Sequence, residues 1–304
     1  MSSELPTQGR IVVGTDGSER AEKAVQWAAE RAGKRRLPLL IVQVIPRDQT
    51  LGTVPSAVYG ELPGSILAEY QRDYVEQVRK RLTELAEQAR ADNPDLQVET
   101  AVVEGKPSVV LAEASRDADL VVVGARGATA PRTVKWLGGV SDAIVTHSQG
   151  PIAVITDEAH ENPQGPVVVG VDDSAPARVA ARLAFRAADT RGVPVVAVYA
   201  YTYGPAESAW DPSVWDPSGT KHQEALTEHV RQIVADAINE YPNVPVEVRV
   251  VRGRPQEALV EASDGAGLVV VGSRGRGGFR GLLLGSTSKH VLRESHSPVI
   301  VTRG

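Results

Sequence analysis

The apolar residues of this chain form short runs that are separated by longer amphipathic stretches. Runs such as Leu120–Val123 and Leu268–Val271 are rich in β-branched residues and end at a glycine. Short runs of this kind are typical of strands buried in a parallel sheet. Between the runs, apolar residues recur at spacings of three and four, as in Tyr70, Tyr74 and Val78, which is the pattern of a helix with one buried face. The alternation predicts an α/β fold, in which helices cover both faces of a parallel sheet.

This pattern occurs twice, because five sequence blocks return in the same order in the second half of the chain. The separation of paired blocks shortens along the chain, so the first copy carries extra residues in its middle. A repeat of about 150 residues has the size of a whole domain. We predict one domain at 1–157, a linker at 158–163 and a second domain at 164–304. The paired blocks are Ile11–Ser18 and Val167–Ser174, Pro38–Val42 and Pro194–Val198, Val103–Pro107 and Val251–Pro255, Leu120–Gly127 and Leu268–Gly275, and Pro151–Val154 and Pro298–Val301.

Local signals set the ends of the predicted elements in each copy. Ser18 and Ser174 are good N-cap residues for a first helix, and Pro107 and Pro255 suit the first turn of a later one. The last strand of each copy is an edge candidate, and an edge has to be covered or paired. In the second copy we predict one amphipathic helix along Leu226, Val230, Ile233, Val234 and Ile238. The third, fourth and last strands are predicted at Gln97–Val103, Leu120–Gly124 and Pro151–Ile155 and, in the second copy, at Val246–Val251, Leu268–Gly272 and Pro298–Thr302.

Composition and charge exclude several classes of function. Apolar residues make up 42% of the chain and charged residues 23%, which is enough apolar material for a core. No run approaches the ~20 apolar residues of a membrane helix, and the polar segment Met1–Gly9 lacks the apolar centre of a signal peptide. We therefore expect a cytoplasmic protein without a membrane partner. The chain has no cysteine, which excludes disulfides and thiolate chemistry, and its six histidines form no i, i+4 pair. A formal net charge of −5 argues against a nucleic-acid partner.

A glycine-rich loop follows the fourth strand of the second copy. Gly272-Ser-Arg-Gly275 is followed, after nine residues, by Gly285-Ser286. Glycines let the backbone approach an anion closely, and successive N–H groups can then surround it. The helix expected to begin at Ser286 adds free N–H groups and its positive dipole end. The motif predicts a phosphate site, to which the hydroxyls of Ser286, Thr287 and Ser288 and the charges of Arg274, Arg276 and Arg280 would contribute.

An aspartate follows the first strand of each copy. Asp16 and Asp172 occupy equivalent positions just after that strand. A carboxylate there can accept hydrogen bonds from ribose hydroxyls or from an adenine amine. In open parallel sheets, ligands bind beyond the carboxyl ends of the strands, where the strand order reverses. Because Asp172 and the Gly272 loop both leave carboxyl ends of strands, we expect them to face one cleft.

These residues carry a resemblance to a known family. The spacing Gly-x2-Gly-x9-Gly-Ser after Val-Val-Val-Gly, with the opening Val171-Asp172-Asp173-Ser174, resembles the universal stress protein family. The resemblance covers nearly the whole chain as a tandem pair. It implies two similar doubly wound open sheets of five parallel strands in the order 3-2-1-4-5, a Rossmann-like fold of the adenine nucleotide α-hydrolase type. It also implies binding of ATP, ADP or AMP, with or without Mg²⁺.

The first copy departs from this pattern where the phosphates would lie. Ten residues, not nine, separate Gly127 from Gly138, and Gly139 replaces the Ser/Thr, while Ser141 remains one turn further on. We therefore expect weaker binding in the first copy. The complete set of nucleotide-binding candidates is Gly14, Thr15, Asp16, Val44, Gly124, Ala125, Arg126, Gly127, Ala128, Thr129, Ala130, Gly138, Gly139, Val140 and Ser141 in the first copy and Gly170, Val171, Asp172, Val198, Gly272, Ser273, Arg274, Gly275, Arg276, Gly277, Gly278, Gly285, Ser286, Thr287 and Ser288 in the second. By the resemblance, Val198 would meet the adenine through its backbone.

Each of these features also has a plainer interpretation. The glycine-rich loop can be a tight strand-to-helix connection that binds nothing. The two aspartates can be helix caps, and the loop arginines can form a solvated surface. The segment from Tyr199 to Trp215 carries a cluster of aromatic residues, which suits a lid or a partner surface. For this segment we favour a loop packed on its own domain or on the sister copy.

The sequence points to a binding protein more than to an enzyme. No nucleophile–base–acid constellation and no metal site stand out, so we predict no catalytic residues. The leading hypothesis is an ATP-dependent sensor or regulator in stress response and growth control, as the family resemblance implies. The alternatives are a slow ATPase or nucleotidyl-transfer enzyme of the same fold, and a structural pairing module without ligand. The resemblance also implies pairing of the two copies along their last strands, in addition to a homodimer, and an unidentified protein partner.

Overall fold

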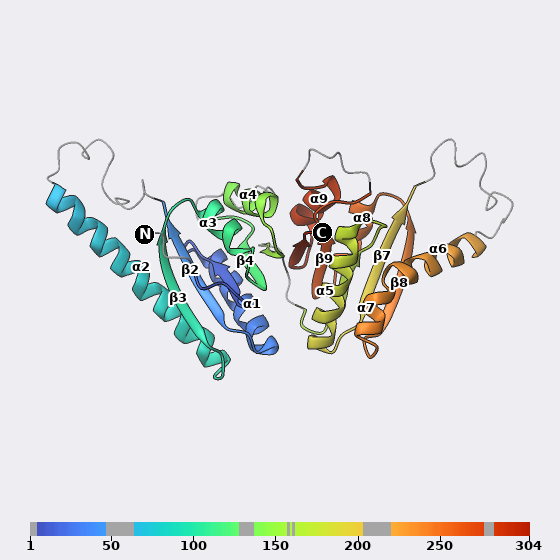
Figure 1. The fold of residues 1–304 in the computed structure, drawn as a ribbon, viewed down its shortest axis with the longest axis horizontal. Coiled ribbons are helices and arrows are strands. Elements are labelled where there is room, and N and C mark those ends of the chain that lie inside the picture. The colour runs from blue at the N-terminus through green and yellow to red at the C-terminus, as the bar shows by residue number, and fades with distance from the viewer. Residues whose placement is uncertain are drawn as a thin grey trace. The chain divides into compact units, whose positions relative to one another are not determined.

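The computed structural model describes residues 5–46, 64–127, 137–156, 159, 162–202, 220–276 and 283–304 (Figure 1). The chain divides into two compact units, Met1–Asp157 and Glu158–Gly304. The predicted linker at 158–163 begins at this division, and part of it lies outside the described residues. These are called unit 1 and unit 2.

Both units alternate strands and helices as the sequence pattern predicts. In unit 1 the elements are β1 (Ile11–Gly14), α1 (Glu19–Arg35), β2 (Leu39–Ile45), α2 (Gly64–Asp92), β3 (Val98–Glu104), α3 (Pro107–Ala114), β4 (Leu120–Gly124), α4 (Gly139–His147) and β5 (Ile152–Ile155). In unit 2 they are β6 (Val167–Gly170), α5 (Ala175–Arg191), β7 (Val195–Tyr201), α6 (Thr220–Ile233), α7 (Ala235–Glu240), β8 (Val246–Arg252), α8 (Pro255–Ser263), β9 (Leu268–Gly272), α9 (Ser286–Glu294) and β10 (Val299–Thr302).

The strand order is the same in the two units. In unit 1 it is β3-β2-β1-β4-β5, and in unit 2 it is β8-β7-β6-β9-β10, with parallel pairing between the neighbours within each unit. Both are the order 3-2-1-4-5, so the predicted fold class and topology are confirmed. The chain reverses its winding between β1 and β4 and between β6 and β9. Ligands of open parallel sheets bind at such points, beyond the carboxyl ends of the strands.

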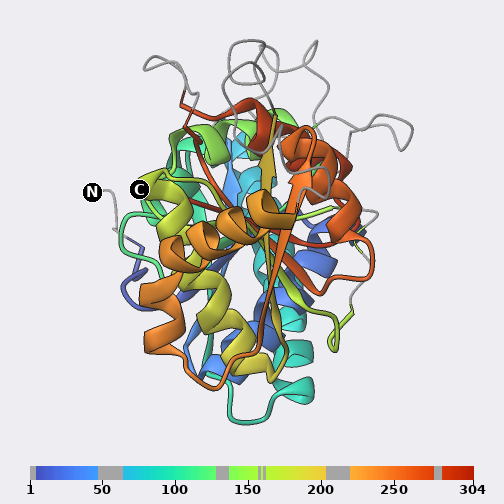
Figure 2. The same cartoon turned by 90° about the vertical axis from the view of Figure 1, so that its right-hand side faces the viewer.

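Helices cover both faces of each sheet. In unit 1, α1 and α2 pack against each other and against the strands, α2 runs along β3, and α3 and α4 form a second packed pair (Figure 1). In unit 2, α5 packs on β6 and β9, and α6 packs on β8, in the part of the molecule that faces the viewer in Figure 2. The central strands β1 and β6 are buried from Ile11 to Val13 and from Val167 to Val169. These apolar runs are therefore the cores that the hydrophobic pattern predicts.

The first helix of each unit begins at the predicted N-cap serine. The side chains of Ser18 and Ser174 accept hydrogen bonds from Ala21 N and Ala177 N, at 3.3 Å in both units. Each helix then ends on a left-handed residue, Arg36 in unit 1 and Gly192 in unit 2. These caps fix the start of α1 and α5 immediately beyond Asp16 and Asp172.

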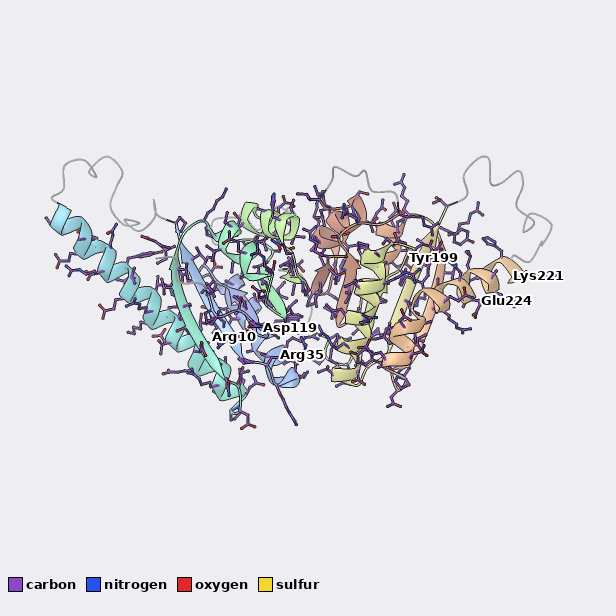
Figure 3. The ribbon with its side chains drawn as sticks, in the orientation of Figure 1. Arg10, Arg35, Asp119, Tyr199, Lys221 and Glu224 are labelled. Atoms are coloured by element: carbon purple, nitrogen blue, oxygen red, sulfur yellow. The ribbon has the colours of Figure 1, made fainter. Side chains whose placement is uncertain are left out.

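An ion pair ties the other end of α1 to the sheet of unit 1. Arg35, at the end of α1, meets Asp119, just before β4, through both guanidinium nitrogens, with a distance of 2.9 Å between Nη2 and Oδ1 (Figure 3). Both side chains are largely buried. A two-point contact of this geometry fixes orientation as well as distance. It holds α1 across the strands that carry the candidate site at their opposite ends.

The predicted helix along Leu226–Ile238 is interrupted in unit 2. The structure has two helices, α6 and α7, separated at Val234, whose φ of −97° and ψ of 7° leave the helical region. The break falls on the β-branched pair Ile233 and Val234, whose side-chain rotamers are restricted in a helix.

Within the described residues, no helix is long and apolar enough to cross a membrane.

Candidate functional site

The predicted aspartate and the predicted glycine-rich loop meet at the carboxyl edge of unit 2. Asp172 follows β6 and Gly275 follows β9, and these two strands are neighbours. Asp172 Oδ2 accepts a hydrogen bond of 2.8 Å from the backbone N–H of Arg276 in the loop. A Cβ added to Gly275 would lie 2.5 Å from the same oxygen. Asp172 and the loop therefore lie in direct contact at this edge.

The other carboxylate oxygen of Asp172 supports the start of α5. Asp172 Oδ1 accepts from Ser174 N at 3.0 Å and also from the hydroxyl of Ser174. The same hydroxyl oxygen accepts from Ala177 N, so Ser174 is the N-cap and Asp172 holds it in place. The helix-cap interpretation and the binding interpretation thus use different oxygens of one carboxylate.

Unit 1 repeats this arrangement. Asp16 Oδ1 accepts from Ser18 N at 3.1 Å and from Ser18 Oγ at 2.6 Å. A Cβ added to Gly127 would lie 2.8 Å from Asp16 Oδ2, and Arg20 donates to the carbonyl of Gly127 at 3.2 Å. The recurrence shows that the two sequence copies build the same carboxylate–loop contact independently.

The glycines that recur in the two copies serve two different purposes. Side chains at Gly275 and Gly127 would press on the aspartates, as described above. Added Cβ atoms at Gly14 and Gly170 would instead meet Leu111 at 2.5 Å and Leu259 at 3.0 Å, and at Gly272 one would meet Pro176 at 2.8 Å. These three are packing positions where a helix comes close to a strand end. Among the described glycines, only at Gly127 and Gly275 would an added Cβ meet an aspartate oxygen.

Two of the predicted phosphate donors are engaged within the fold. Ser288, which is buried, donates its hydroxyl to Gly272 O at 2.6 Å. Ser141 makes the equivalent contact in unit 1, donating to Gly124 O at 2.7 Å. Each serine therefore ties the first turn of a helix, α9 or α4, back to the strand before the loop. Ser286 and Thr287 remain as hydroxyl candidates at the start of α9.

The starts of α9 and α4 differ from those of α1 and α5 in their capping. Glycines occupy the N-cap positions, Gly285 and Gly138, and no side-chain cap is present among the described residues. Instead the N-cap N–H groups bind the loop, with Gly285 N donating to Ser273 O at 2.7 Å and Gly138 N to Ala125 O at 2.8 Å. A helix start of this kind keeps its first-turn N–H groups for an anion.

Arg303, which sequence analysis did not single out, lies beside the loop of unit 2. Its guanidinium donates to Leu283 O at 2.7 Å, just before α9. Burial, and then the charge of Arg274, lower the pKa of Arg303 below the usual arginine range. Arginine nevertheless stays protonated in proteins. The two cations raise the local positive potential next to the start of α9. Arg303 belongs to no recognisable motif, so the sequence offered no reason to select it.

A second polar group at the same edge was also missed by sequence analysis. Arg276 donates to the hydroxyl of Tyr199 at 2.8 Å and forms an ion pair with Asp173. Asp173 also meets His229 Nε2 of α6 at 2.6 Å, and the rings of His229 and Tyr199 pack edge to face with centroids 6.1 Å apart. Tyr199 lies on β7 near the carboxyl end of the strand (Figure 3). Arg276, Tyr199, Asp173 and His229 come from four separate segments of the chain. No local sequence motif therefore predicts that they meet.

Comparison with known proteins identifies the family. The sequence profile of the universal stress protein family matches residues 8–156 and again residues 165–303. The chain belongs to the universal stress protein family. It is 36% identical over 318 residues to a universal stress protein of Mycobacterium tuberculosis, and this alignment covers 100% of the chain and 97% of the relative. A second universal stress protein of the same species is 36% identical over 313 residues, with coverage of 100% and 99%.

A solved structure agrees with this assignment at the level of the fold. The crystal structure of a universal stress protein from Archaeoglobus fulgidus matches with a TM-score of 0.68 at 21% identity, over 97% of this chain and 99% of that one. The tandem arrangement predicted from the repeat is therefore that of a tandem universal stress protein.

The register of β2 and β7 shows that the binding candidates Val44 and Val198 are not equivalent positions in the two units. Val42 pairs with Gly14, and Val198 pairs with Gly170, so these two valines are equivalent in the two units. Val44 lies two residues further along β2, and its counterpart in unit 2 is Ala200. The candidates Val44 and Val198 thus occupy different levels of this universal stress protein's sheets.

The remaining candidates fall into three groups. Thr15, Ala125, Arg126, Val171 and Ser273 are buried at the strand ends. Gly139 and Val140 begin α4, where the Val140 side chain is 44% exposed and an added Cβ at Gly139 would meet no atom within 4 Å. The candidates Ala128, Thr129, Ala130, Gly277 and Gly278 lie outside the described residues, as do Arg280 and most of the aromatic segment Tyr199–Trp215.

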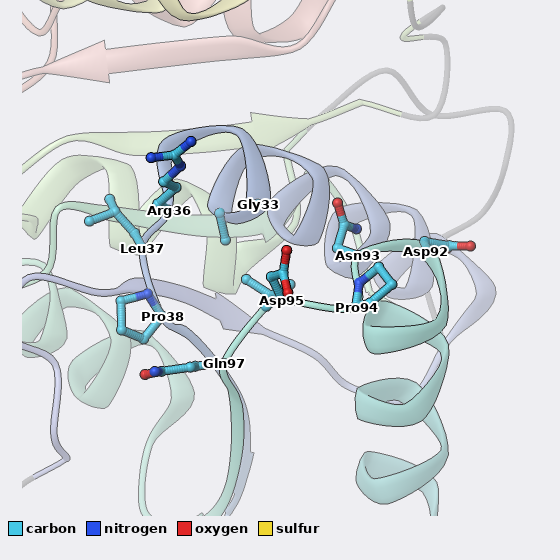
Figure 4. Close-up of a pocket in the computed structure, with 11 residues that line it drawn as sticks. Gly33, Arg36, Leu37, Pro38, Asp92, Asn93, Pro94, Asp95 and Gln97 are labelled. Atoms are coloured by element: carbon cyan, nitrogen blue, oxygen red, sulfur yellow. The ribbon is translucent and has the colours of Figure 1, made fainter.

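A cavity in unit 1 lies away from this site. Its volume is about 620 Å³, and it is lined by the turn after α1 and the turn after α2, including Arg36, Asn93 and Asp95 (Figure 4). These turns precede β2 and β3, so the cavity lies at the amino ends of the strands. It is therefore separate from the carboxylate–loop contact, which lies at the carboxyl ends.

The ionisation of Tyr199 is expected to make the stability of unit 2 depend on pH in the alkaline range. Burial, and then the charge of Asp172, raise the pKa of the Tyr199 hydroxyl above its usual value. A raised pKa in the folded state contributes stability that is complete below about pH 10 and is lost as the pH rises through the raised value. We expect Tyr199→Phe to lessen the loss of unfolding free energy as the pH rises above about 10. Urea unfolding at several pH values measures this, and Tyr70→Phe, at a 46% exposed site, should change nothing.

Proposed function

We propose that both units bind adenine nucleotide at the carboxyl edges of their sheets and that unit 2 binds it more tightly. The observation that carries the proposal is the meeting of one aspartate and one glycine-rich loop in each unit, at the reversal point of the strand order. The aspartate would accept hydrogen bonds from the ribose hydroxyls. The loop and the start of α9 or α4 would hold the phosphates.

The charges of unit 2 favour an anionic ligand. Burial, and then the charge of Arg274, lower the pKa of Arg303, so the two cations repel each other beside the loop. A phosphate group would relieve this repulsion and would accept charge-assisted hydrogen bonds. Thr156 occupies the position of Arg303 in unit 1, so the second cation is present in unit 2 only. This difference adds to the missing loop hydroxyl as a reason for weaker binding in unit 1.

The direct test combines released ligand with titration. The full chain is purified without added nucleotide, denatured, and examined for adenine nucleotides by mass spectrometry. Calorimetric titration of the emptied chain with AMP, ADP and ATP then gives the number of sites. Two sites of unequal affinity are expected. No released nucleotide together with no binding on titration would eliminate the proposal.

Restoring the missing hydroxyl should strengthen unit 1. Gly139 stands where unit 2 has Ser286, and its added Cβ would meet no atom within 4 Å. We expect Gly139→Ser to lower the dissociation constant of the weaker site about threefold to tenfold, since one hydrogen bond contributes about 0.5–1.5 kcal/mol. Gly139→Ala is the matched control, because it adds the carbon without the hydroxyl. Equal effects of the two substitutions would show that the hydroxyl plays no part.

We further propose that nucleotide occupancy acts as a signal and not as a step of rapid catalysis. Among the described residues, no group of three or more His, Asp or Glu side chains is placed to hold a metal ion. Any Mg²⁺ would therefore arrive with the nucleotide and be held through its phosphates and water. Turnover of ATP by pure protein on the order of the median enzyme, ~10 per second, would refute this assignment. A homodimer stays a prediction, which sedimentation with and without nucleotide would test.

A further inference from the structure

The side chain of Arg276 crosses the candidate site of unit 2. Arg276 follows β9, whereas its partner Tyr199 lies on β7, and β6 separates these two strands. The register places Val198 beside the last residue of β6, so Tyr199 lies just beyond the end of that strand. The same guanidinium nitrogen, Nη2, also pairs with Asp173, which follows β6. The arginine therefore spans the carboxyl end of the central strand, and we call Arg276 with these contacts the strap.

The strap and the proposed nucleotide use the same acceptor. The backbone N–H of Arg276 binds Asp172 Oδ2 at 2.8 Å, and Ser174 binds Oδ1. Oδ2 is thus the oxygen that a ribose hydroxyl would approach, and the strap holds a donor against it. The side-chain contacts to Tyr199 and Asp173 keep the backbone of Arg276 in this position. A nucleotide therefore has to displace or share this contact, which two side-chain interactions of Arg276 support.

Asp173 is itself fixed from a second direction. His229 Nε2 of α6 lies 2.6 Å from Asp173 Oδ1, whereas Arg276 pairs with Oδ2. Each oxygen of Asp173 therefore has one basic partner. The ring of His229 also packs edge to face on Tyr199, which ties the two anchors of the strap together. The anchors form one connected group on the β7 and α6 side of the site.

Unit 1 has none of the residues that build the strap. Its sequence has Gly17 in place of Asp173, Gln43 in place of Tyr199 and Ala128 in place of Arg276. Gly17 adopts a left-handed φ of 77°, which favours glycine, and a Cβ added there would meet the guanidinium of Arg81. The difference is therefore built into the backbone as well as into the side chains.

We propose that Tyr199 and Asp173 are positioning residues that hold Arg276 over Asp172 and thereby limit nucleotide binding to unit 2. This inference rests on the proposed nucleotide site. While the strap is anchored it occupies the ribose acceptor, so only the fraction with a released strap is competent to bind. An apparent dissociation constant rises in proportion as the competent fraction falls. Unit 2 thus combines the more complete site with a restraint that unit 1 lacks.

The test uses the full chain with the site of unit 1 blocked by Gly127→Val, which presses a side chain onto Asp16. Surface plasmon resonance with unlabelled AMP and ATP gives the association and dissociation rates of unit 2. We expect Tyr199→Phe and Asp173→Asn each to raise the association rate about threefold to tenfold, the range for losing one hydrogen bond or one partly exposed ion pair. The dissociation rate should stay the same. Tyr241→Phe, at the opposite end of unit 2, is the matched control and should change neither rate.

The outcomes separate the strap from the nucleotide site itself. If the blocked chain without further changes binds neither AMP nor ATP, the proposed function fails in unit 2. If it binds, but the anchor variants show unchanged association, the strap is wrong while the function stands. Faster dissociation in the variants would also overturn the strap, because the anchors would then belong to the bound state. Circular dichroism and thermal unfolding of each variant confirm that unit 2 is folded.

Discussion

Replacing Gly275 by valine is expected to remove nucleotide binding from unit 2 and to leave unit 1 intact. The added Cβ would lie 2.5 Å from Asp172 Oδ2, where ordinary contacts begin near 3.4 Å. The Asp172 carboxylate would have to turn away and would lose its hydrogen bond from Arg276 N. Since the backbone of Gly275 is not among the glycines with positive φ, valine itself is tolerated there. The substitution therefore acts on the carboxylate more than on the fold.

The size of the effect follows from the acceptor that is lost. A hydrogen bond to a charged group contributes about 1.5–3 kcal/mol, which corresponds to roughly tenfold to hundredfold in affinity. Calorimetric titration with ATP should show one site in place of two. Gly127→Val is the matched variant, because its Cβ would lie 2.8 Å from Asp16 Oδ2, and it should remove the weaker site.

The pair of variants also contains its own controls. Each single variant should keep the site of the other unit at its original affinity, and the double variant should bind no nucleotide. Unchanged binding to unit 2 after Gly275→Val would show that Asp172 is not the acceptor. The loss of both sites from one substitution would indicate damage to the fold, which thermal unfolding would reveal.

The fold was predictable because its signals are local and repeated. Buried runs such as Leu120–Val123 and helix caps such as Ser18 and Ser174 act within a few residues, and the internal repeat shows each of them twice. The aspartate and the loop were predictable as neighbours for a different reason. Both follow strands of a parallel sheet, so the topology alone brings Asp172 and Gly275 to one edge.

The finer contacts of the site could not be predicted because they depend on three-dimensional proximity. Arg303 follows the last strand, and nothing in its sequence neighbourhood links it to Arg274. The Tyr199 and Asp173 anchors meet Arg276 only because β7, β6 and β9 are adjacent. Ser288 matches the phosphate motif in sequence, yet its hydroxyl binds Gly272 O. A motif gives the residue type and its spacing, but it does not say which partner the side chain binds.

Replacing Phe185 by alanine is expected to be among the most destabilising substitutions in unit 2. Phe185 lies on α5, is 0% exposed, and belongs to a helix that packs on β6 and β9, the two strands that carry the site. Removing a buried phenyl ring costs about 3–5 kcal/mol, because apolar burial is lost and a cavity remains. Unit 1 has Ala29 at the equivalent position, so the ring is specific to the core of unit 2.

The lost stability should lower the temperature of one thermal transition, that of unit 2. The nucleotide site of unit 2 should then be lost at a lower temperature than the site of unit 1. Each unit has its own buried core, so we expect calorimetry to show the transition of unit 2 roughly 10 °C lower, at about 2–4 °C per kcal/mol for a domain of this size. Val179→Ala, at a 44% exposed position of the same helix, is the control and should change the stability by no more than about 0.5 kcal/mol. Between the two transitions, the chain should retain only the weaker nucleotide site of unit 1. If both transitions fell together, the units would unfold as one, and the tight site could not be lost alone by warming.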